Sequence, residues 1–532
     1  MHNDIQQAFL SYQRGDRQQA VQLGRKVLKR DRRSVDAMHL MGLIEKDQGA
    51  FAKARDWFRR GLKIAPRHVH LLNSAGLLEE HLGNHSRAKA LYRKALSVDS
   101  GYFHARYNLA SLCDSLHDYP QASRLYREVL EQQPGHVEAL ANLSLILEAQ
   151  HQPDEARALA QRAVGINPEH FVARLTLANI ANRDKAFGEV ISLLLPMFQS
   201  GRLSPVNQAV AGGKCAFAFE KQGDFETAFK LYQASNQVLH EAYAPRMHNL
   251  QSLYAPGAVE QIGNSIAQFD FGKAAEIEEA PVFLVGFPRS GTTLLDQVLT
   301  SHSRVTVLEE RENLVDAYSR FPATEAGLRD LRNADEKTLS GLRRKYWQRV
   351  KQELGERVGG QVIVDKQPLN AIALLHIARL FPGAKVIVAL RDPRDCVFSS
   401  FQQRFGMSQA MFQFLRLETA VSYYGKVMKI VTAMRDAEAL PMHFVRYEEV
   451  IGDFTHEIGG MVGFLGLEWE DALFDYQATA RSRHISTPSA AQVIQPLYTS
   501  SIGKWWNFQP WIGDRFEPLE RWVKEWSYTT VT

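Results

Sequence analysis

The chain has 532 residues, too many for one ordinary domain, so about two or three domains are expected. Its 45% apolar and 23% charged residues are typical of a soluble globular protein, and a net charge of +4 does not favour nucleic-acid binding. No run of about 18 apolar residues predicts a membrane span. The first residues lack a basic start before an apolar core, and three cysteines cannot build a disulfide framework, so a cytoplasmic protein is expected.

The first half of the chain repeats with a period of 34 residues. Alanines mark the period at Ala20, Ala54, Ala88, Ala122 and Ala156. Aromatic residues follow three of them by four positions, small residues precede four of them by twelve, and prolines follow three of them by twelve. Small residues let two helices approach closely, and proline ends a helix, so the period predicts stacked helix pairs.

This pattern resembles the tetratricopeptide repeat and covers roughly residues 1–240. The resemblance implies an α-helical solenoid with an extended concave face. Capture of a protein partner or acceptor and self-association, for example as a homodimer, both stay open for that face. Residues 241–280 are interpreted as a linker to a second domain, residues 281–532.

A phosphate-binding loop is predicted near the start of the second half, in PVFLVGFPRSGTTLLDQVLT, residues 281–300. An apolar run at 282–285 predicts a buried strand, and apolar residues at helical spacing follow Thr293. Between them lies a glycine-bounded turn. Strand, loop and helix together favour an anion at the helix N-terminus, because backbone N–H groups converge there.

The loop matches a Walker A spacing only in part. Gly286 and Gly291 are correctly spaced, but the lysine position holds Thr292, and the nearby cation is Arg289. The loop therefore favours a nucleotide whose reacting group is not a magnesium-bound γ-phosphate. A kinase or NTPase is accordingly disfavoured, and no metal site is predicted.

Further apolar runs at 362–364, 385–390 and 443–447 alternate with helical stretches. This alternation predicts an α/β domain with a central parallel sheet, P-loop-like in its first turn. Ligands of such sheets bind at the carboxyl ends of the strands. Lys366, Arg391 and Tyr447 stand at those ends, as does the loop.

The loop, FPRSGTTL at 287–294, resembles the 5′-phosphosulfate loop of sulfotransferases, which use 3′-phosphoadenylyl sulfate (PAPS). The run VALRDPRDCVFSSF at 388–401 resembles their 3′-phosphate motif. The resemblance is greatest to the protein-tyrosine sulfotransferase branch and covers about residues 281–510. It implies cosubstrate contacts from Arg289, Ser290, Gly291, Thr292, Thr293, Leu294, Arg391 and Ser399.

The resemblance also implies catalytic roles. Glu310, in VLEE at 307–310, corresponds to the general base, and Lys366, in DKQP at 365–368, contacts the transferring group. Ser489 precedes QVIQP at 492–496 and is expected to act beside Lys366 and the cosubstrate. Lys504, in a Lys-Trp pair, and Tyr447 are expected to contact the nucleotide. The cluster Trp505, Trp506 and Trp511 is interpreted as packing.

Sulfuryl transfer gives these residue types a chemical purpose. The reaction is an in-line displacement in which negative charge grows on oxygens around sulfur, so fixed cations and donors stabilise it. Arg289, Lys366 and Ser489 would supply them. A tyrosine hydroxyl, with a pKa of roughly 10, needs a base such as Glu310 to accept its proton.

Two departures from the tyrosine branch affect the expected acceptor. Leu308 stands where the branch has glycine, and Glu312 and Asp316 would repel an acidic acceptor. A protein or peptide tyrosine is the favoured acceptor. A carbohydrate or small phenol stays open, as does a repeat scaffold with an inactive nucleotide-binding module.

Overall fold

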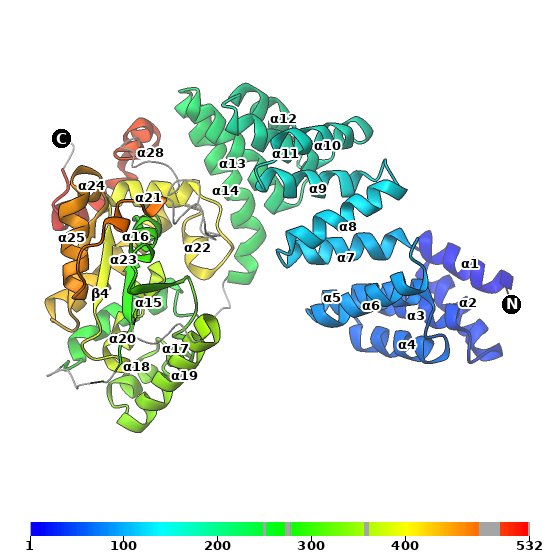
Figure 1. Cartoon of the computed structure of the whole chain (residues 1–532), viewed down its shortest axis with the longest axis horizontal. Coiled ribbons are helices and arrows are strands. Elements are labelled where there is room, and N and C mark those ends of the chain that lie inside the picture. Colours follow the sequence, from blue (N-terminus) through cyan, green and yellow to red (C-terminus); the bar gives the residue numbers. More distant parts are fainter. Residues whose placement is uncertain are drawn as a thin grey trace. The chain divides into compact units, whose positions relative to one another are not determined.

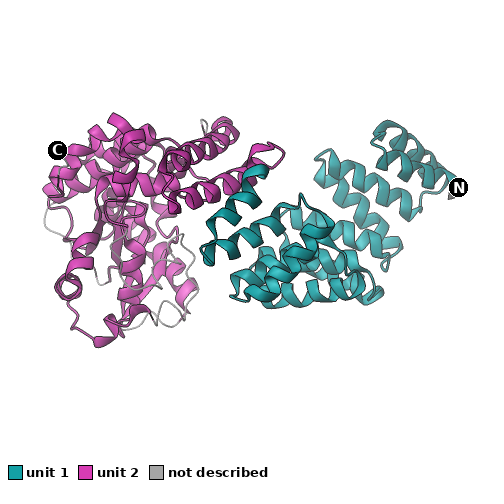
Figure 2. Ribbon diagram, turned by 90° about the horizontal axis from the view of Figure 1, so that it is seen from above, with its two compact units in different colours: residues 1–197 teal, residues 198–532 magenta. Residues whose placement is uncertain are grey.

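The computed structural model describes residues 2–247, 252–271, 277, 279–355, 361–477 and 501–529. The chain divides into two compact units, residues 1–197 and 198–532 (Figure 2). The first is entirely helical in its described residues, and the second is built around a parallel sheet. The predicted solenoid followed by an α/β domain is thereby confirmed.

The first unit is a series of helix pairs in which neighbours along the chain pack together (Figure 1). Its helices are α1 His2–Gln13, α2 Arg17–Arg30, α3 Val35–Asp47, α4 Phe51–Ile64, α5 Val69–His81, α6 His85–Val98, α7 Phe103–Ser115, α8 Tyr119–Gln132, α9 Val137–Ala149, α10 Pro153–Ile166, α11 Phe171–Arg183 and α12 Phe187–Gln199. The five periodic alanines are fully buried in the second helices of the pairs. In two of the pairs the glycine of the first helix lies against the aromatic residue of the second: a Cβ at Gly42 would lie 2.2 Å from the Phe58 ring, and one at Gly76 would lie 2.5 Å from the Tyr92 ring.

Gly76 and Gly165 offer a matched test of this packing. Gly76→Ala should destabilise the array by about 1–3 kcal/mol, because the new methyl group overlaps the buried Tyr92 ring. Gly165→Ala, in α10, meets no atom within 4 Å and should be neutral or stabilising, since alanine favours a helix. Urea unfolding of the two variants measures the difference, and equal stabilities would contradict the packing argument.

Two helices of the predicted array pack with the second unit. These are α13 Pro205–Lys221 and α14 Phe225–Met247, whose buried Ala216, Phe229 and Tyr232 belong to the hydrophobic cluster on one face of the sheet. The helix α15 Pro256–Ser265 lies within the predicted linker and packs against α23 Leu417–Asp436. The predicted domain boundaries at residues 240 and 280 stay a prediction. In the structure, the helices α13, α14 and α15 pack within the unit that contains the sheet.

Five parallel strands form the sheet, in the order β2-β3-β1-β4-β5. The strands are β1 Val282–Gly286, β2 Val305–Glu309, β3 Val362–Lys366, β4 Val386–Leu390 and β5 Met442–Arg446. Four of them confirm predicted runs. The edge strand β2 was not predicted as a strand, because its sequence VTVLE is short and includes a polar threonine and a charged glutamate.

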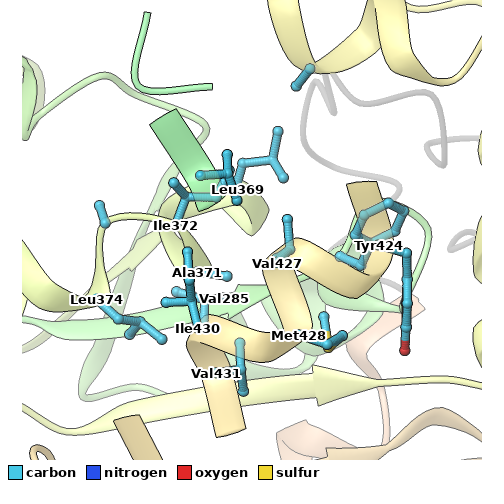
Figure 3. Close-up of a cluster of buried hydrophobic side chains, with 14 of the residues drawn as sticks. Val285, Leu369, Ala371, Ile372, Leu374, Tyr424, Val427, Met428, Ile430 and Val431 are labelled. Carbon is cyan, nitrogen blue, oxygen red and sulfur yellow. The ribbon is translucent and has the colours of Figure 1, made fainter. Parts of the chain in front are cut away.

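Helices cover both faces of the sheet. The remaining α-helices of the second unit are α16 Thr292–Thr300, α17 Val315–Arg320, α18 Glu325–Arg332, α19 Glu336–Leu354, α20 Leu374–Leu380, α21 Pro393–Gln402, α22 Gln409–Gln413, α24 Tyr447–Gly452, α25 Phe454–Leu465, α28 Gln509–Ile512 and α29 Glu520–Glu525. Side chains alternate along β1, so Phe283 and Val285 pack on the face that α23 covers, whereas Val282 and Leu284 face α16 and α25. Figure 3 shows Val285 among Val427, Ile430 and Val431 of α23.

This architecture brings the carboxyl ends of all five strands to one edge of the sheet, where the loop after β1 also lies. Within the part of the chain that the structure describes, no helix is both long and apolar enough to cross a membrane.

Candidate functional site

The loop between β1 and α16 is held in an unusual backbone conformation. Gly291 caps α16 with a φ of +102°, and Arg289 has a φ of +72°. Residues other than glycine rarely adopt this backbone conformation. A Cβ at Gly286 would lie 2.6 Å from the Ala389 carbonyl oxygen, so only glycine fits there. Strained backbone of this kind is concentrated at functional sites, and here it directs the loop around the N-terminus of α16.

The two predicted phosphate motifs meet beside this loop. The Arg289 Nε donates a hydrogen bond to the Ser399 Oγ at 3.0 Å, and the Arg391 Nη1 donates to the Arg289 carbonyl at 3.2 Å. The Arg391 guanidinium also lies 5.1 Å from the centre of the Tyr447 ring and donates to the Ser501 carbonyl. The Tyr447 hydroxyl is 3.0 Å from the Ser501 Oγ. Two arginines, a serine and a tyrosine from distant parts of the sequence are thereby joined.

Some buried donors of this cluster have no hydrogen-bond partner among the described residues. They are the Ser290 Oγ in the loop and the Arg391 Nε. Leaving a buried donor unpaired costs roughly 1–3 kcal/mol, and native proteins rarely leave one. Donors that converge beside a helix N-terminus fit an anionic ligand, and the two motifs therefore fit the phosphate groups of a nucleotide.

Lys366, the last residue of β3, is fully buried and surrounded by carboxylates. Its Nζ lies 2.9 Å from the Glu310 Oε1, 3.7 Å from the Asp296 Oδ2 and 3.8 Å from the Glu309 Oε1. Asp296 comes from α16 and Glu309 from β2, which pairs with β3 so that Glu309 lies opposite Lys366. A buried ammonium needs counter-charges, and these three carboxylates supply them.

Glu310 is the most accessible of the three carboxylates. Its side chain is 36% exposed, against 17% for Glu309 and 1% for Asp296. Its φ is +50°, and its backbone N–H donates to the Lys366 carbonyl at 2.7 Å. The chain therefore turns sharply after β2 and presents Glu310, held by Lys366, at the edge of the sheet. A carboxylate in this position can accept a proton from a molecule that enters from solvent.

Asp365 supports the same strand end from inside the core. Its Oδ2 accepts hydrogen bonds from Asn313 at 3.0 Å and from the Tyr346 hydroxyl at 2.8 Å. Burial raises the pKa of the Asp365 carboxyl to about 6. Between pH 4 and 6 the folded protein thus holds a proton that the unfolded chain releases, so this group makes the protein less stable as pH rises.

Asp365→Asn should remove that pH dependence. Altered hydrogen bonds change the free energy of unfolding of the variant by an amount that does not depend on pH. On top of this, its free energy of unfolding relative to wild type should rise by about 3 kcal/mol at most between pH 4 and pH 7. Other raised carboxyls, such as Asp395, are present in both proteins and cancel. Unfolding by urea across this pH range measures the effect, and a difference that stays constant with pH would refute it.

Lys504 lies beside the nucleotide motifs but is occupied by protein groups. Its Nζ is 2.8 Å from the Glu220 Oε1 and donates to the Gln402 Oε1 at 3.1 Å. Neighbouring Trp505 is buried beneath the Arg394 guanidinium at 4.6 Å, whereas Trp506 is exposed. The packing role expected for Trp505 agrees with this arrangement.

The other predicted residues are placed as follows. Thr292 and Thr293 are buried in the first turn of α16, and the Leu294 side chain packs in the core between α16 and the sheet. Ser489 lies outside the described residues. Sequence reasoning gave no role to Asp296 and Glu309, although both lie within the motif stretches, and it missed Ser501, Gln402 and Glu220, which only folding brings to the site.

The acidic residues Glu312 and Asp316, beyond Glu310, both have partners within the protein. Glu312 accepts hydrogen bonds from the hydroxyls of Tyr254 and Tyr318. Asp316 forms ion pairs with Lys345 at 3.3 Å and Arg349 at 2.8 Å. The repulsion expected between Asp316 and an acidic acceptor is therefore weaker than its charge alone implies.

Comparison with known proteins agrees with this organisation. Residues 281–471 match the model of the sulfotransferase family, and residues 7–69 and 81–146 match tetratricopeptide-repeat models. An uncharacterised protein of Aquifex aeolicus is 26% identical over 360 residues, which cover 64% of this chain and 45% of that protein.

Two relatives with named activities match a shorter stretch. Protein-tyrosine sulfotransferase 2 of Gallus gallus is 23% identical over 238 residues, and protein-tyrosine sulfotransferase 1 of Danio rerio is 25% identical over 238 residues. Each match covers 42% of this chain, and 62% and 65% of those proteins respectively. The matched part thus spans about half to two thirds of the length of these relatives.

Proposed function

Because the chain combines tetratricopeptide repeats with a sulfotransferase-family domain, we propose that it transfers a sulfuryl group from PAPS to an acceptor hydroxyl. A protein or peptide tyrosine is the favoured acceptor, because the named relatives are protein-tyrosine sulfotransferases. The observation that carries the proposal is the 2.9 Å pair of Lys366 and Glu310, at the same sheet edge as the phosphate-binding loop.

In the proposed reaction the acceptor oxygen attacks sulfur while the bond from sulfur to the 5′-phosphate oxygen breaks. Glu310 accepts the proton of the acceptor hydroxyl, and adenosine 3′,5′-bisphosphate leaves. Arg289 and Lys366 provide positive charge where negative charge grows on the oxygens around sulfur. The loop N–H groups, with Ser290, Thr292 and Thr293, would hold the 5′-phosphate.

Arg391, Ser399 and Tyr447 would hold the other end of the cosubstrate. The Arg391 Nε is a buried donor with no hydrogen-bond partner among the described residues, which suits the 3′-phosphate. Ser489 and Lys504 complete the proposed set of cosubstrate-binding residues. For Ser489 this role rests on the resemblance alone. The repeats would present a protein acceptor or partner, since such arrays offer an extended binding surface.

The test is transfer of labelled sulfate from PAPS to a panel of tyrosine peptides, glycans and small phenols, read by mass spectrometry. Sulfation of a tyrosine peptide is the expected result. Transfer only to a glycan or a small phenol would correct the acceptor, whereas tight binding of adenosine 3′,5′-bisphosphate without any transfer would indicate an inactive nucleotide-binding module on a repeat scaffold.

A further inference from the structure

The helix pair α13–α14 is anchored directly to the helix that carries Ser399. The Asn236 side chain of α14 donates from its Nδ2 to the Phe401 carbonyl at 2.9 Å, and its Oδ1 accepts from the Arg404 Nη1 at 2.8 Å. Both contacts lie at the end of α21, within five residues of Ser399. The last repeat-like helices are therefore fixed to the nucleotide side of the second unit.

Glu220, near the end of α13, extends this anchoring into the candidate site. Its carboxylate is buried and fully engaged: the Oε1 contacts the Lys504 Nζ at 2.8 Å, and the Oε2 accepts from the Tyr232 hydroxyl at 3.0 Å and the Gln402 Nε2 at 2.9 Å. Side chains from α14 and α21 thus bind one oxygen of this carboxylate, and Lys504 contacts the other. Such a saturated buried carboxylate costs desolvation, which its hydrogen bonds and the ion pair offset.

The Glu220 carboxylate stabilises the charged form of Lys504. Burial lowers the pKa of the Lys504 ammonium, and the Glu220 carboxylate opposes that shift, while Lys221 and Arg391 add to it. Tyr232 lies behind Glu220, with Arg404 beyond it. Among these groups Glu220 is the anion that contacts Lys504, so removing its charge leaves a buried ammonium beside two further cations.

The backbone around Lys504 is held separately. Asp395 of α21 accepts hydrogen bonds from the backbone N–H groups of Gly503 at 2.7 Å and Trp505 at 3.1 Å. Loss of the Glu220 charge should therefore leave the segment in place and affect chiefly the protonation and direction of the Lys504 side chain.

We propose that Glu220 is a positioning residue for nucleotide binding, which holds the Lys504 side chain beside α21, the helix that carries Ser399. The inference rests on the proposed function, in which Lys504 contacts a phosphate group of the cosubstrate. It also gives α13, which lies within the predicted repeat array of residues 1–240, a role at the nucleotide site.

The test is calorimetric titration of the full chain with adenosine 3′,5′-bisphosphate between pH 6.5 and pH 9. Glu220→Gln keeps the size of the side chain and an oxygen acceptor but removes the charge. Its affinity should fall about tenfold near pH 6.5 and further as pH rises, because Lys504 then loses its proton more readily. Wild-type affinity should fall less over this range than that of the variant.

Matched variants separate positioning from general structure. Tyr232→Phe leaves the Glu220–Lys504 contact in place and should bind within about twofold of wild type. In a Lys504→Met background, Glu220→Gln should cause no further loss. A loss that is equal at all pH values and persists in the Lys504→Met background would overturn the proposal, as would unchanged affinity in Glu220→Gln.

A second variant covers the case in which Glu220→Gln does not fold. Glu220→Asp keeps the charge but withdraws it by one methylene, so its affinity should fall between those of wild type and Lys504→Met, and affinity equal to wild type would overturn the proposal. Failure of the wild-type protein itself to bind adenosine 3′,5′-bisphosphate would instead refute the proposed function.

Discussion

Glu310→Gln should lower sulfate transfer by about 10²–10⁴-fold while leaving the affinity for adenosine 3′,5′-bisphosphate nearly unchanged. The substitution preserves the shape of the side chain and the left-handed backbone at this position, where φ is +50°. It removes the one property that the proposed mechanism needs, a carboxylate that can accept the acceptor's proton. Initial rates with labelled PAPS and calorimetry with the bisphosphate measure the two effects separately.

Glu312→Gln is the matched control. Glu312 is also an exposed carboxylate on the same turn, but it contacts Tyr254 and Tyr318 rather than Lys366. Its replacement should change the rate by no more than a few-fold. Equal losses in the two variants would show that general acidity of this turn, and not a base at Glu310, supports transfer.

Lys366→Met should damage both stability and activity. The side chain is fully buried among three carboxylates, and its removal leaves Asp296, Glu309 and Glu310 without this shared cation. Breaking a buried ion pair in this way costs about 3–5 kcal/mol, and we expect about 3 kcal/mol here because Glu310 is partly exposed to water. Sulfate transfer should fall at least about 100-fold, since the transferring group loses one of the two cations proposed to stabilise its charge.

Lys345→Met provides the control for Lys366→Met. Lys345 also pairs with a carboxylate, Asp316 at 3.3 Å, but its side chain is 58% exposed, so its loss should cost less than about 1 kcal/mol. Urea unfolding at pH 7 compares the variants. A loss for Lys366→Met similar to that of Lys345→Met would contradict a cation that organises the site.

Local pattern predicted much of the fold. The 34-residue period predicted the helix pairs, because each repeat buries the same alanine, and three of them place an aromatic residue four positions on. Apolar runs gave β1, β3, β4 and β5, which are buried or flanked by turn residues. The strand β2 was missed because Thr306 and Glu309 interrupt its apolar pattern, as expected at the edge of a sheet.

Long-range contacts explain what local pattern could not predict at the site. Glu309 meets Lys366 because β2 pairs with β3, a pairing that joins residues 57 positions apart in this register. Glu220 meets Lys504 across 284 positions, and nothing in the sequence of α13 distinguishes it from other glutamates in helices. Motifs identified the residues proposed to bind phosphate, whereas the residues that hold those groups in place follow from the tertiary structure.

A crystal structure of the protein with adenosine 3′,5′-bisphosphate tests the central claim most directly. We predict one phosphate group within about 3 Å of the loop N–H groups from Gly291 to Thr293, and the other within hydrogen-bond distance of Arg391 and Ser399. A bisphosphate bound elsewhere, or bound with its phosphate groups away from Arg289 and Arg391, would contradict the account.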